Sequence, residues 1–302
     1  MIAIDWGTSS LRAYRLDAHG TVLAQRSATA GLLSCQGVFE AVLARQLQAW
    51  DDETVVMAGM IGSRSGWHEV PYVACPAGID QIAAGLHEVH AASLPGRRVF
   101  IAPGVSHRGA GGPPEVMRGE ETQVLGLADS LPASGSHTVC LPGTHSKWVL
   151  VEGGCIVSLR SAVTGELYAL LRGHSLLAAL MPAQGGEGST EADDPEAFCR
   201  GVAASARDGG LSNHLFGVRT LGLFGELSPA QAPPYLSGLL IGHELRGLLP
   251  VGCAAVHLVG NAALVQRYER ALAVLGTACH RHGEVLSAQG LLRLALARGL
   301  RV

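Results

Sequence analysis

The sequence predicts an α/β protein made of two similarly built domains. An apolar strand that leads into a Gly-Thr turn and then into a second apolar strand occurs twice, at 2–16 and at 138–151. Each copy continues through a glycine turn into a third strand that ends in Arg-Ser-Ala, at 26–28 and at 160–162. Since a repeated supersecondary unit is typical of repeated domains, the two copies predict two domains of one design.

The first copy is followed by helices and strands in alternation. The run from 37 to 50 carries apolar residues at the helical spacing of three and four, whereas 54–58 is a short apolar run typical of a buried strand. The same patterns, with the Gly and Pro content, predict a helix at 80–91, a strand at 98–102, a loop at 106–114 and a helix at 120–131.

The second copy is followed by a similar series. We expect helices at 166–181, 196–206, 234–249, 262–275 and 289–300, strands at 220–224 and 255–259, and a polar, glycine-rich loop at 185–194. Three strands followed by helices and strands, once in each half, is the order of the actin-like ATPase and sugar-kinase fold. The sequence therefore predicts two ribonuclease-H-like domains, at 1–133 and 134–302, with the active site in the cleft between them.

Composition excludes several classes of protein. The 302 residues are enough for two domains with separate cores, and a formal net charge of −3 gives no field for nucleic acid or an anionic membrane. No apolar run approaches the ~20 residues of a membrane span, and the N-terminus lacks a basic segment followed by an apolar run. The seven cysteines contain no CxxC pair, so we expect a reduced, cytoplasmic protein.

The two Gly-Thr turns are candidate phosphate-binding sites. A glycine-led turn flanked by hydroxyl groups leaves backbone N–H groups pointing outward, where they can donate to phosphate oxygens. Two such turns facing each other would clamp one polyphosphate. The candidate residues are Gly7, Thr8, Ser9 and Ser10 in the first turn, and Gly143, Thr144, His145 and Ser146 in the second.

The copies differ at two positions that suit phosphoryl chemistry. Asp5 precedes the first turn, whereas Leu141 stands at the equivalent place in the second. Mg²⁺ on a nucleotide is held by one or two carboxylates with phosphate oxygens and water, so Asp5 is the candidate magnesium ligand, although an aspartate here can also simply form the turn. Lys147 follows the second turn and is the only lysine in the chain, which indicates that a compact positive charge is needed there.

A strand predicted at 255–259 ends in Gly260-Asn261, directly before a predicted helix. A glycine at such a junction allows close backbone approach to adenine and ribose, and the helix N-terminus adds positive potential. The chain has no Walker A motif, because Gly-Lys does not occur in it. Gly260 and Asn261 are therefore the candidate adenosine site.

Two adjacent acids, Glu120 and Glu121, begin the helix predicted after Gly119. The helix dipole favours their ionised form, so one of them can accept the proton of an acceptor hydroxyl. Neighbouring helical residues diverge by about 100°, so only one faces the cleft, and the pattern leaves open which. Both can equally be ordinary first-turn acids that stabilise the helix.

With these residues in place, the chain resembles the 2-dehydro-3-deoxygalactonokinase family over essentially its whole length. The resemblance rests on Asp-Trp-Gly-Thr at 5–8, on Pro-Gly-Thr-His-Ser-Lys-Trp at 142–148, and on 59–72, 117–123 and 164–168. It implies an enzyme that uses ATP and Mg²⁺ to phosphorylate the 6-hydroxyl of 2-dehydro-3-deoxy-D-galactonate in galactonate catabolism. Related kinases place their acid two residues after a glycine at this helix start, which favours Glu121 as the catalytic base and Glu120 as its neighbour or a cap.

A sugar acid needs cationic donors for its carboxylate, and a guanidinium can bind a carboxylate through two parallel hydrogen bonds. Arg64 ranks first, because its loop follows a first-domain strand at the carboxyl end, where open α/β sheets bind ligands. The other candidate substrate-binding residues are Ser63, Trp67, Tyr72, Arg118 and Arg12.

Two alternative functions remain open. The acceptor could be an epimeric sugar acid such as 2-dehydro-3-deoxy-D-gluconate, because the contacts that distinguish the hydroxyl groups are not visible in the sequence. The chain could also be an actin-like ATPase that acts on a protein partner, although such members carry extra subdomains or tails and this chain is almost all core. We expect ATP and a small sugar acid as partners, and leave a homodimer open.

Overall fold

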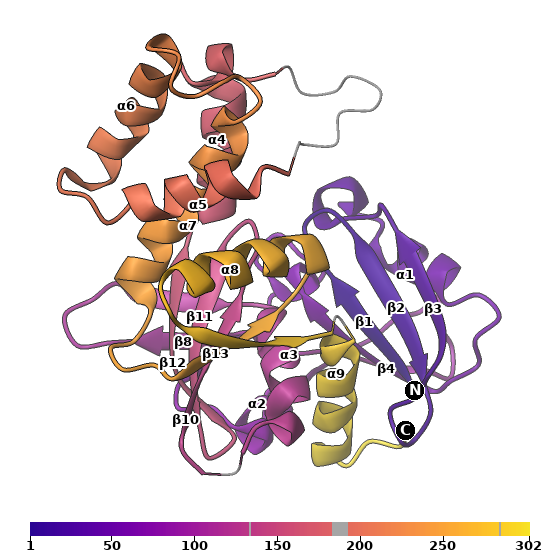
Figure 1. Cartoon of the computed structure of the whole chain (residues 1–302). Coiled ribbons are helices and arrows are strands. Elements are labelled where there is room, and N and C mark those ends of the chain that lie inside the picture. Colours follow the sequence, from indigo (N-terminus) through magenta and orange to yellow (C-terminus); the bar gives the residue numbers. More distant parts are fainter. Residues whose placement is uncertain (133, 183–192, 284) are drawn as a thin grey trace. The chain divides into compact units, whose positions relative to one another are not determined.

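The computed structural model describes residues 1–132, 134–182, 193–283 and 285–302 (Figure 1). Its chain divides into two compact units. Unit 1 comprises Met1–His137, Val149–Leu159 and His282–Val302, and unit 2 comprises Thr138–Trp148 and Arg160–Arg281. The units thus differ from the predicted domains, because 149–159 and the C-terminal segment belong with the N-terminal residues.

Side-chain and backbone contacts explain this difference. The C-terminal helix α9 (Leu286–Ala297) packs against α3 (Glu120–Leu127), and Arg293 on α9 donates to the Leu125 carbonyl at 2.6 Å. Segment 149–159 is tied to unit 1 by two backbone hydrogen bonds of 2.9 Å between Ala77 and Ile156. Such pairings join residues far apart in the sequence, so a boundary drawn from local patterns does not detect them.

The first sheet has six strands in the order β3-β2-β1-β4-β7-β6. Its strands are β1 (Ile2–Trp6), β2 (Leu11–Leu16), β3 (Val22–Ala28), β4 (Thr54–Gly59), β6 (His87–Val89) and β7 (Arg98–Ile101). β1 is antiparallel to β2 and parallel to β4, so Asp5 lies beside Arg12 on one side and Ala58 on the other. This register places the carboxyl ends of β1 and β4 together.

Apolar side chains from this sheet and from α1 (Phe39–Gln46) form a hydrophobic core cluster of unit 1. Fully buried members include Trp6, Leu11, Leu43, Val55 and Ile101. The Trp6 ring meets Phe39 edge to face at 5.8 Å, and its indole N–H donates to the Ala30 carbonyl at 2.8 Å. The strand that carries Asp5 is therefore firmly held by its neighbours.

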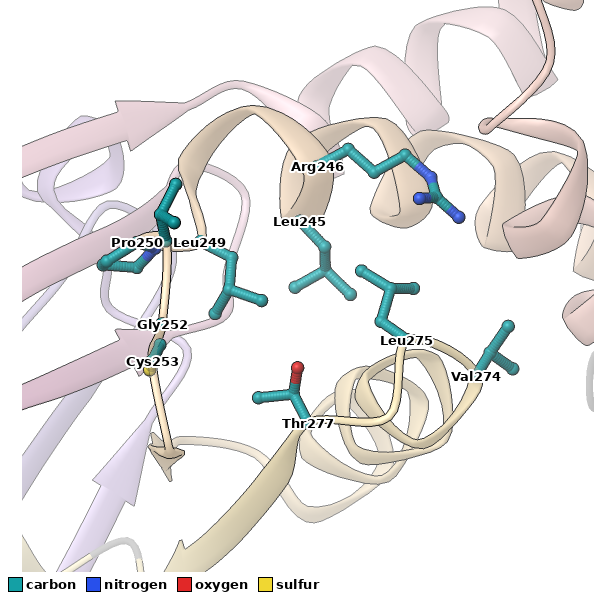
Figure 2. Close-up of a pocket in the computed structure, with 10 residues that line it drawn as sticks. Leu245, Arg246, Leu249, Pro250, Gly252, Cys253, Val274, Leu275 and Thr277 are labelled. Carbon is teal, nitrogen blue, oxygen red and sulfur yellow. The ribbon is translucent and has the colours of Figure 1, made fainter.

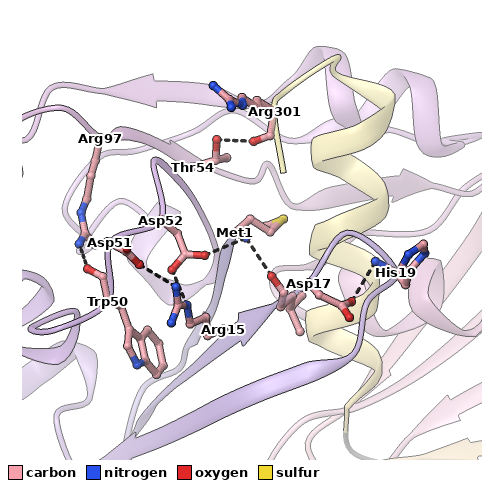
Figure 3. Close-up of polar contacts among 11 residues, drawn as sticks. Met1, Arg15, Asp17, His19, Trp50, Asp51, Asp52, Thr54, Arg97 and Arg301 are labelled. Carbon is pink, nitrogen blue, oxygen red and sulfur yellow. Dashed lines mark hydrogen bonds and ion pairs between the residues drawn. The ribbon is translucent and has the colours of Figure 1, made fainter.

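The amino end of β1 is fixed by charge. The Met1 ammonium donates to the Leu16 carbonyl at 2.9 Å, and it pairs with Asp52 at 3.2 Å (Figure 3). Arg15 binds both Asp51 and Asp52, and the Thr54 hydroxyl donates to the Arg301 carbonyl near the C-terminus. These contacts lie at the opposite end of β1 from Asp5, so they anchor the strand without occupying the first turn.

The second sheet has five strands in the order β12-β11-β10-β13-β14. They are β10 (Ser136–Leu141), β11 (Ser146–Glu152), β12 (Cys155–Ala162), β13 (Ala255–Val259) and β14 (Ala278–His282). β10 is parallel to β13, with Thr138 opposite Val256. The order of the first four strands repeats that of β3-β2-β1-β4, as the internal repeat predicts.

Five helices belong to unit 2 among the described residues (Figure 1). They are α4 (Thr164–His174), α5 (Pro195–Ala204), α6 (Gly210–Leu223), α7 (Ala232–Leu248) and α8 (Ala262–Val274). α7 contacts α4, α5, α6 and α8, and 13 of its 17 residues are buried. It is the central helix of the unit.

Most predicted elements are confirmed, but four predictions are wrong. Residues 220–224 are the end of α6 and not a strand, because a short apolar run has no periodicity that separates the two. The helix predicted at 80–91 stops at Ala84, and 87–89 pairs with β7 as β6. The helix predicted at 166–181 ends at His174, since Ser175 is extended, and a short 3₁₀ turn (Ala178–Leu180) follows.

The fourth difference is the loop predicted at 106–114. It contains most of β8 (Val105–Arg108), which pairs with β5 (Val73–Ala74) and with β9 (Pro114–Met117) in a small three-stranded sheet. β8 and β9 flank a glycine-rich turn, so this segment is a hairpin that leads directly to Arg118 and α3. The loop predicted at 185–194 falls mostly outside the described residues, which resume at 193.

Candidate active-site residues

The first Gly-Thr turn is closed by backbone hydrogen bonds and backed by Gly31. The Gly7 N–H donates to the Ser10 carbonyl at 2.9 Å, and the Gly7 carbonyl accepts from Leu32 at 3.1 Å. Gly31 lies so close that a β-carbon on it would be 2.1 Å from the Thr8 carbonyl oxygen. Thr8, Ser9 and Ser10 are exposed. The turn is thus rigid on its inner side and open on its outer side.

The second turn is backed in the same way by Gly165. A β-carbon on Gly165 would lie 2.5 Å from the Gly143 carbonyl oxygen and 2.9 Å from the Thr144 α-carbon. The Glu166 N–H donates to the Thr144 carbonyl at 3.0 Å, and the Glu166 carboxylate lies 2.5 Å from His145 Nε2. Thr144 and His145 are exposed, so they remain candidates for phosphate contact.

These supporting glycines, Gly31 and Gly165, are not among the predicted site residues, although the sequence contains a signal for them. Each follows its Arg-Ser-Ala tripeptide by three residues, in Arg-Ser-Ala-Thr-Ala-Gly at 26–31 and Arg-Ser-Ala-Val-Thr-Gly at 160–165. A glycine is needed at both places because any side chain would collide with the turn backbone. The repeat therefore extends past the tripeptide to the residue that supports each turn.

Ser146 and Lys147, two of the predicted ATP-binding residues, have buried side chains. The Ser146 side chain is fully buried and lies 2.7 Å from the Tyr268 hydroxyl, so it faces the interior of unit 2. Lys147 is 6% exposed, and its ammonium donates to the His145 carbonyl at 3.0 Å. These two side chains pack on the inner side of the second turn. Of the residues predicted to bind phosphate there, Thr144 and His145 are exposed and Gly143 is partly exposed.

Gly260 and Asn261 join β13 to α8 as predicted. The Asn261 side chain is the N-cap of the helix, accepting from Ala263 at 3.0 Å and from Leu264 at 3.4 Å. Asparagine is a preferred N-cap residue, because its oxygen satisfies N–H groups that have no partner within the helix. The Asn261 oxygen is therefore engaged by the helix, while Gly260 next to it carries no side chain.

Asp5 stands at the end of β1 beside the start of α3. Its pKa is raised to about 6, mainly by burial, while nearby Arg12 opposes the rise and Glu120 contributes to it. Two glycines with positive φ bring the helix close, Gly59 at 96° and Gly119 at 105°. A β-carbon on Gly59 would lie 2.6 Å from the Trp6 carbonyl oxygen and 3.4 Å from Asp5 Oδ1. The carboxyl groups of Asp5 and Glu120 therefore belong to one local cluster in unit 1.

The two acids of α3 have different surroundings. Glu121 is fully buried, its Oε2 accepts from the Gly119 N–H at 2.7 Å, and its Oε1 has no hydrogen-bond partner among the described residues. Burial is the main reason why its pKa rises to about 8. Glu120 is only partly buried, and its Oε2 accepts from the Arg118 N–H at 3.0 Å. At neutral pH Glu121 is thus mostly protonated.

The candidate arginines also differ in their surroundings. The Arg64 side chain is 89% exposed, with Nε 3.5 Å from Glu69. Arg118 is 9% exposed, and its Nη2 donates to the Val70 carbonyl at 2.7 Å while its guanidinium stacks 4.3 Å from the Tyr72 ring centre. Within the described part of the chain, Nε and Nη1 of Arg118 have no hydrogen-bond partner. Arg118 therefore carries unsatisfied N–H groups, and Arg64 does not lie in a pocket.

The remaining predicted substrate residues support their own loop. The Ser63 hydroxyl donates to the Met60 carbonyl at 2.7 Å, and Trp67 is partly buried against the core of unit 1. Tyr72 is 44% exposed and contacts Arg118 with its ring. Of this group, Tyr72 alone combines exposure with contact to a candidate arginine.

A shallow, open pocket in unit 2 is lined by none of these residues (Figure 2). It has a volume of about 620 Å³ and is lined mainly by apolar side chains from the end of α7, the loop after it and the end of α8, including Leu245, Leu249 and Leu275. Arg246 also lines it and donates to the Ser205 hydroxyl at 3.0 Å. No predicted site residue lines this cavity, so it contributes nothing to the chemistry considered above.

Two further observations concern metals and membranes. In the part of the chain that the structure describes, no group of three or more His, Cys, Asp or Glu side chains is arranged to hold a metal ion. None of the described helices combines the length and the apolar content that crossing a bilayer requires.

The sequence matches the model of the 2-keto-3-deoxy-galactonokinase family over residues 5–294. It is 36% identical over 282 residues to the 2-dehydro-3-deoxygalactonokinase of Escherichia coli, covering 91% of this chain and 90% of that protein. It is 37% identical over 280 residues to a protein of Rhizobium meliloti described as a probable 2-dehydro-3-deoxygalactonokinase, covering 89% and 88%.

Solved structures confirm the fold class. A candidate 2-dehydro-3-deoxygalactonokinase from Sinorhizobium meliloti superposes with a TM-score of 0.84 at 33% identity, over 98% of this chain and 97% of that one. The activator of a 2-hydroxyisocaproyl-CoA dehydratase from Clostridium difficile, solved with ADPNP, gives a TM-score of 0.52 at 12% identity over 99% and 96%, a likeness of fold alone. The predicted two-domain α/β fold is therefore confirmed.

Proposed function

Because the chain belongs to the 2-keto-3-deoxy-galactonokinase family, we propose that it transfers the γ-phosphoryl group of ATP to the 6-hydroxyl of 2-dehydro-3-deoxy-D-galactonate in galactonate catabolism. The observation that carries the proposal is the cluster of Asp5 and Glu120 in unit 1, joined by the contact between Gly59 and Gly119. Phosphoryl transfer depends on positioning and on stabilising charge more than on covalent help from the protein. A carboxylate near the end of the central strand β1 and a second one at the start of α3 suit both tasks.

Asp5 is the residue that would hold Mg²⁺. A hard cation on a nucleotide needs one or two carboxylates, and phosphate oxygens and water complete its shell. The Asp5 carboxyl fits this need, because it is fixed by β1 and its pKa of about 6 leaves it largely ionised at neutral pH. When bound, the ion would neutralise charge on the transferring phosphoryl group.

Glu120 is the better candidate for the base that accepts the 6-hydroxyl proton. A general base must be ionised before it can accept a proton, and a carboxyl with a pKa of about 8 is mostly protonated at neutral pH. Glu120 is partly exposed, and it lies close enough to Asp5 to raise the pKa of Asp5. Glu121, preferred from the sequence, instead binds the Gly119 N–H and so shapes the turn that presents Glu120.

Arg118 ranks above Arg64 for the substrate carboxylate. A buried N–H group without a partner costs roughly 1–3 kcal/mol. Nε and Nη1 of Arg118 have no partner among the described residues, and a bound anion explains these two nitrogens better than packing does. Arg118 also directly precedes Gly119 and Glu120, so a small molecule held by its guanidinium would lie near the proposed base. Arg12 is engaged electrostatically with Asp5, which favours a role beside the metal.

Unit 2 would bind the nucleotide. The second turn offers exposed backbone at Gly143, Thr144 and His145, and a β-carbon on Gly143 would meet no atom closer than 3.8 Å. Open space over a rigid glycine suits close approach of phosphate oxygens. Gly260, at the start of α8, is the corresponding point for adenosine. The first turn, at Gly7–Ser10, would bind phosphate from unit 1, and a common cleft for both turns stays a prediction.

An ATP-consumption assay with a panel of acceptors tests the function. We expect turnover with 2-dehydro-3-deoxy-D-galactonate, and phosphorus NMR should identify a 6-phosphate ester as the product. Turnover only with 2-dehydro-3-deoxy-D-gluconate would establish the epimeric alternative. ATP hydrolysis without any acceptor would favour the actin-like ATPase, and no nucleotide turnover with any acceptor would contradict the proposal. A cytoplasmic location and a homodimer also stay predictions.

A further inference from the structure

A buried polar network lies directly behind the second turn and joins three elements of unit 2. Ser146 at the start of β11 lies 2.7 Å from the hydroxyl of Tyr268 on α8. That hydroxyl donates to Glu244 Oε2 on α7 at 2.8 Å, and the Trp148 indole N–H donates to Glu244 Oε1 at 2.7 Å. The four side chains are between 0% and 6% exposed. One carboxylate thus binds a strand and a helix in the interior of the unit.

The hydrogen bonds of this network have a fixed direction. A tyrosine hydroxyl has one proton, and here it is donated to Glu244. The Ser146 hydroxyl must therefore donate to Tyr268, since Tyr268 has no second proton to give. Ser146 thus donates to Tyr268, and Tyr268 donates to Glu244. Glu244 is the final acceptor of this series of hydrogen bonds.

Stability alone does not account for such a network. Replacing a buried ionic group by well-packed apolar residues is often neutral or stabilising, so a buried carboxylate is weak evidence for stability. Both Glu244 oxygens accept hydrogen bonds, which offset part of the cost of burying this polar group. What the network adds is geometry, because it gives Ser146 a single hydrogen-bond acceptor and one rotamer directly after the turn.

We propose that Tyr268 and Glu244 are positioning residues that hold Ser146, and with it the Gly143–His145 turn, in the conformation that binds the phosphates of ATP. The inference rests on the proposed function, in which this turn binds nucleotide. The same carboxylate also fixes α8, the helix that begins after Gly260. Glu244 thereby fixes the position of the Gly143–His145 turn relative to α8.

Two variants remove the link between the turn and the network. Tyr268→Phe deletes the hydroxyl and leaves the bond between Trp148 and Glu244 in place. Ser146→Ala deletes the donor with the loss of a single oxygen atom, and it carries the test if the first variant does not fold. The matched control is Ser205→Ala, because Ser205 is equally buried in unit 2 and bonded to Val202 and Arg246, but not to the turn.

We expect Tyr268→Phe and Ser146→Ala each to raise the KM for ATP, and the Kd of a non-hydrolysable ATP analogue, by up to about tenfold, as a lost hydrogen bond allows. The KM for the sugar acid should not change. The double variant should be no worse than either single one, because both remove the same link. The proposal is overturned if the variants lose thermal stability as Ser205→Ala does while their ATP affinity stays at the wild-type value.

Amide hydrogen exchange of the ATP-free protein separates this inference from the proposed function. Exchange within 142–147 should become faster in Tyr268→Phe and Ser146→Ala, and it should stay unchanged in Ser205→Ala. Unchanged exchange in all three variants overturns the positioning role. If the wild-type chain binds no adenine nucleotide, the proposed function fails, and faster exchange confined to this segment still supports the network as the device that sets the turn.

Discussion

Gly119 at the start of α3 lies against Gly59 at the end of β4, so closely that a β-carbon on Gly119 would be 3.1 Å from the Gly59 α-carbon. Both residues have positive φ, a conformation that costs other residues roughly 1–2 kcal/mol. The contact brings the acids of α3 to the carboxyl ends of β4 and of the neighbouring β1, which carries Asp5. It is therefore the structural basis of the candidate active site in unit 1.

Gly119→Ala should lower kcat by ~10-fold or more. The added methyl group would press against Gly59 and move Glu120 away from Asp5. The matched control is Gly96→Ala, since Gly96 has φ of 80° and no atom within 4 Å of an added β-carbon. Both variants should lose about 1 kcal/mol of stability. Steady-state kinetics and thermal melting of the two variants distinguish the roles. Equal, near-normal kcat in both would show that the contact does not position the site.

Glu120→Gln should lower kcat by ~10²-fold or more with little change in the KM for the sugar acid, because it removes the proposed base. Glu121→Gln should retain more activity, since a protonated carboxyl and an amide are similar in shape and charge. Purified variants compared under saturating substrates give the answer. If Glu121→Gln is the inactive variant and Glu120→Gln turns over normally, the assignment drawn from the sequence was correct and the revision is wrong.

The stability of the protein should depend on pH through Glu121. Its pKa is 4.5 in ordinary surroundings and about 8 in the fold, so in this window the unfolded chain has lost a proton that the folded chain keeps. The free energy of unfolding therefore falls as pH rises, by about 1.4 kcal/mol per pH unit for one proton. Asp5 adds a similar slope only up to its own pKa of about 6.

Denaturant unfolding between about pH 6 and about pH 8 measures the slope in the window where Asp5 contributes least and Glu121 most. Glu121→Gln should abolish it, because the amide does not titrate, and the variant should be the more stable protein at the alkaline end. Subtracting the wild-type curve removes histidine contributions common to both. Parallel curves for the two proteins would show that Glu121 ionises normally in the fold.

Asp5→Asn should keep the fold and abolish magnesium-dependent turnover, because it preserves shape while removing the charge that would hold the ion. Removing this buried carboxyl should also leave thermal stability near neutral pH unchanged or slightly higher, since burial disfavours its ionised form. Turnover is measured across a magnesium titration. A kcat near that of the wild-type protein at saturating magnesium would exclude Asp5 from the site.

Arg118→Lys should raise the KM for the sugar acid by ~10-fold or more, because an ammonium keeps the charge but loses the two-pronged geometry for a carboxylate. Arg64→Lys is the matched control and should have a KM close to that of the wild-type protein, since Arg64 is exposed. The KM for ATP should be unchanged in both. A larger effect at Arg64 than at Arg118 would restore the order predicted from the sequence.

Local patterns in the sequence were sufficient for the repeated strands, for the two Gly-Thr turns and for the acid that distinguishes the first turn from the second. These features depend on residues adjacent in the chain. The apolar run at 2–6 forms a strand between β2 and β4, and a turn follows it at Gly7, as one follows β10 at Gly143. The same local rules predicted a helix beginning at Glu120, and the structure begins α3 there.

Only the tertiary structure decided which of the predicted side chains are buried and which are exposed. Glu121 and Ser146 each belong to a correctly predicted element, yet Glu121 is enclosed by its unit and Ser146 is bonded to Tyr268, 122 residues away. Arg118 is covered by Val70 and Tyr72, while Arg64 is exposed. Burial, the pKa that follows from it and the place of α9 in unit 1 all arise from contacts between distant segments. A sequence pattern specifies which residues can do the chemistry, and packing decides which of them are buried, which are exposed and which keep their charge.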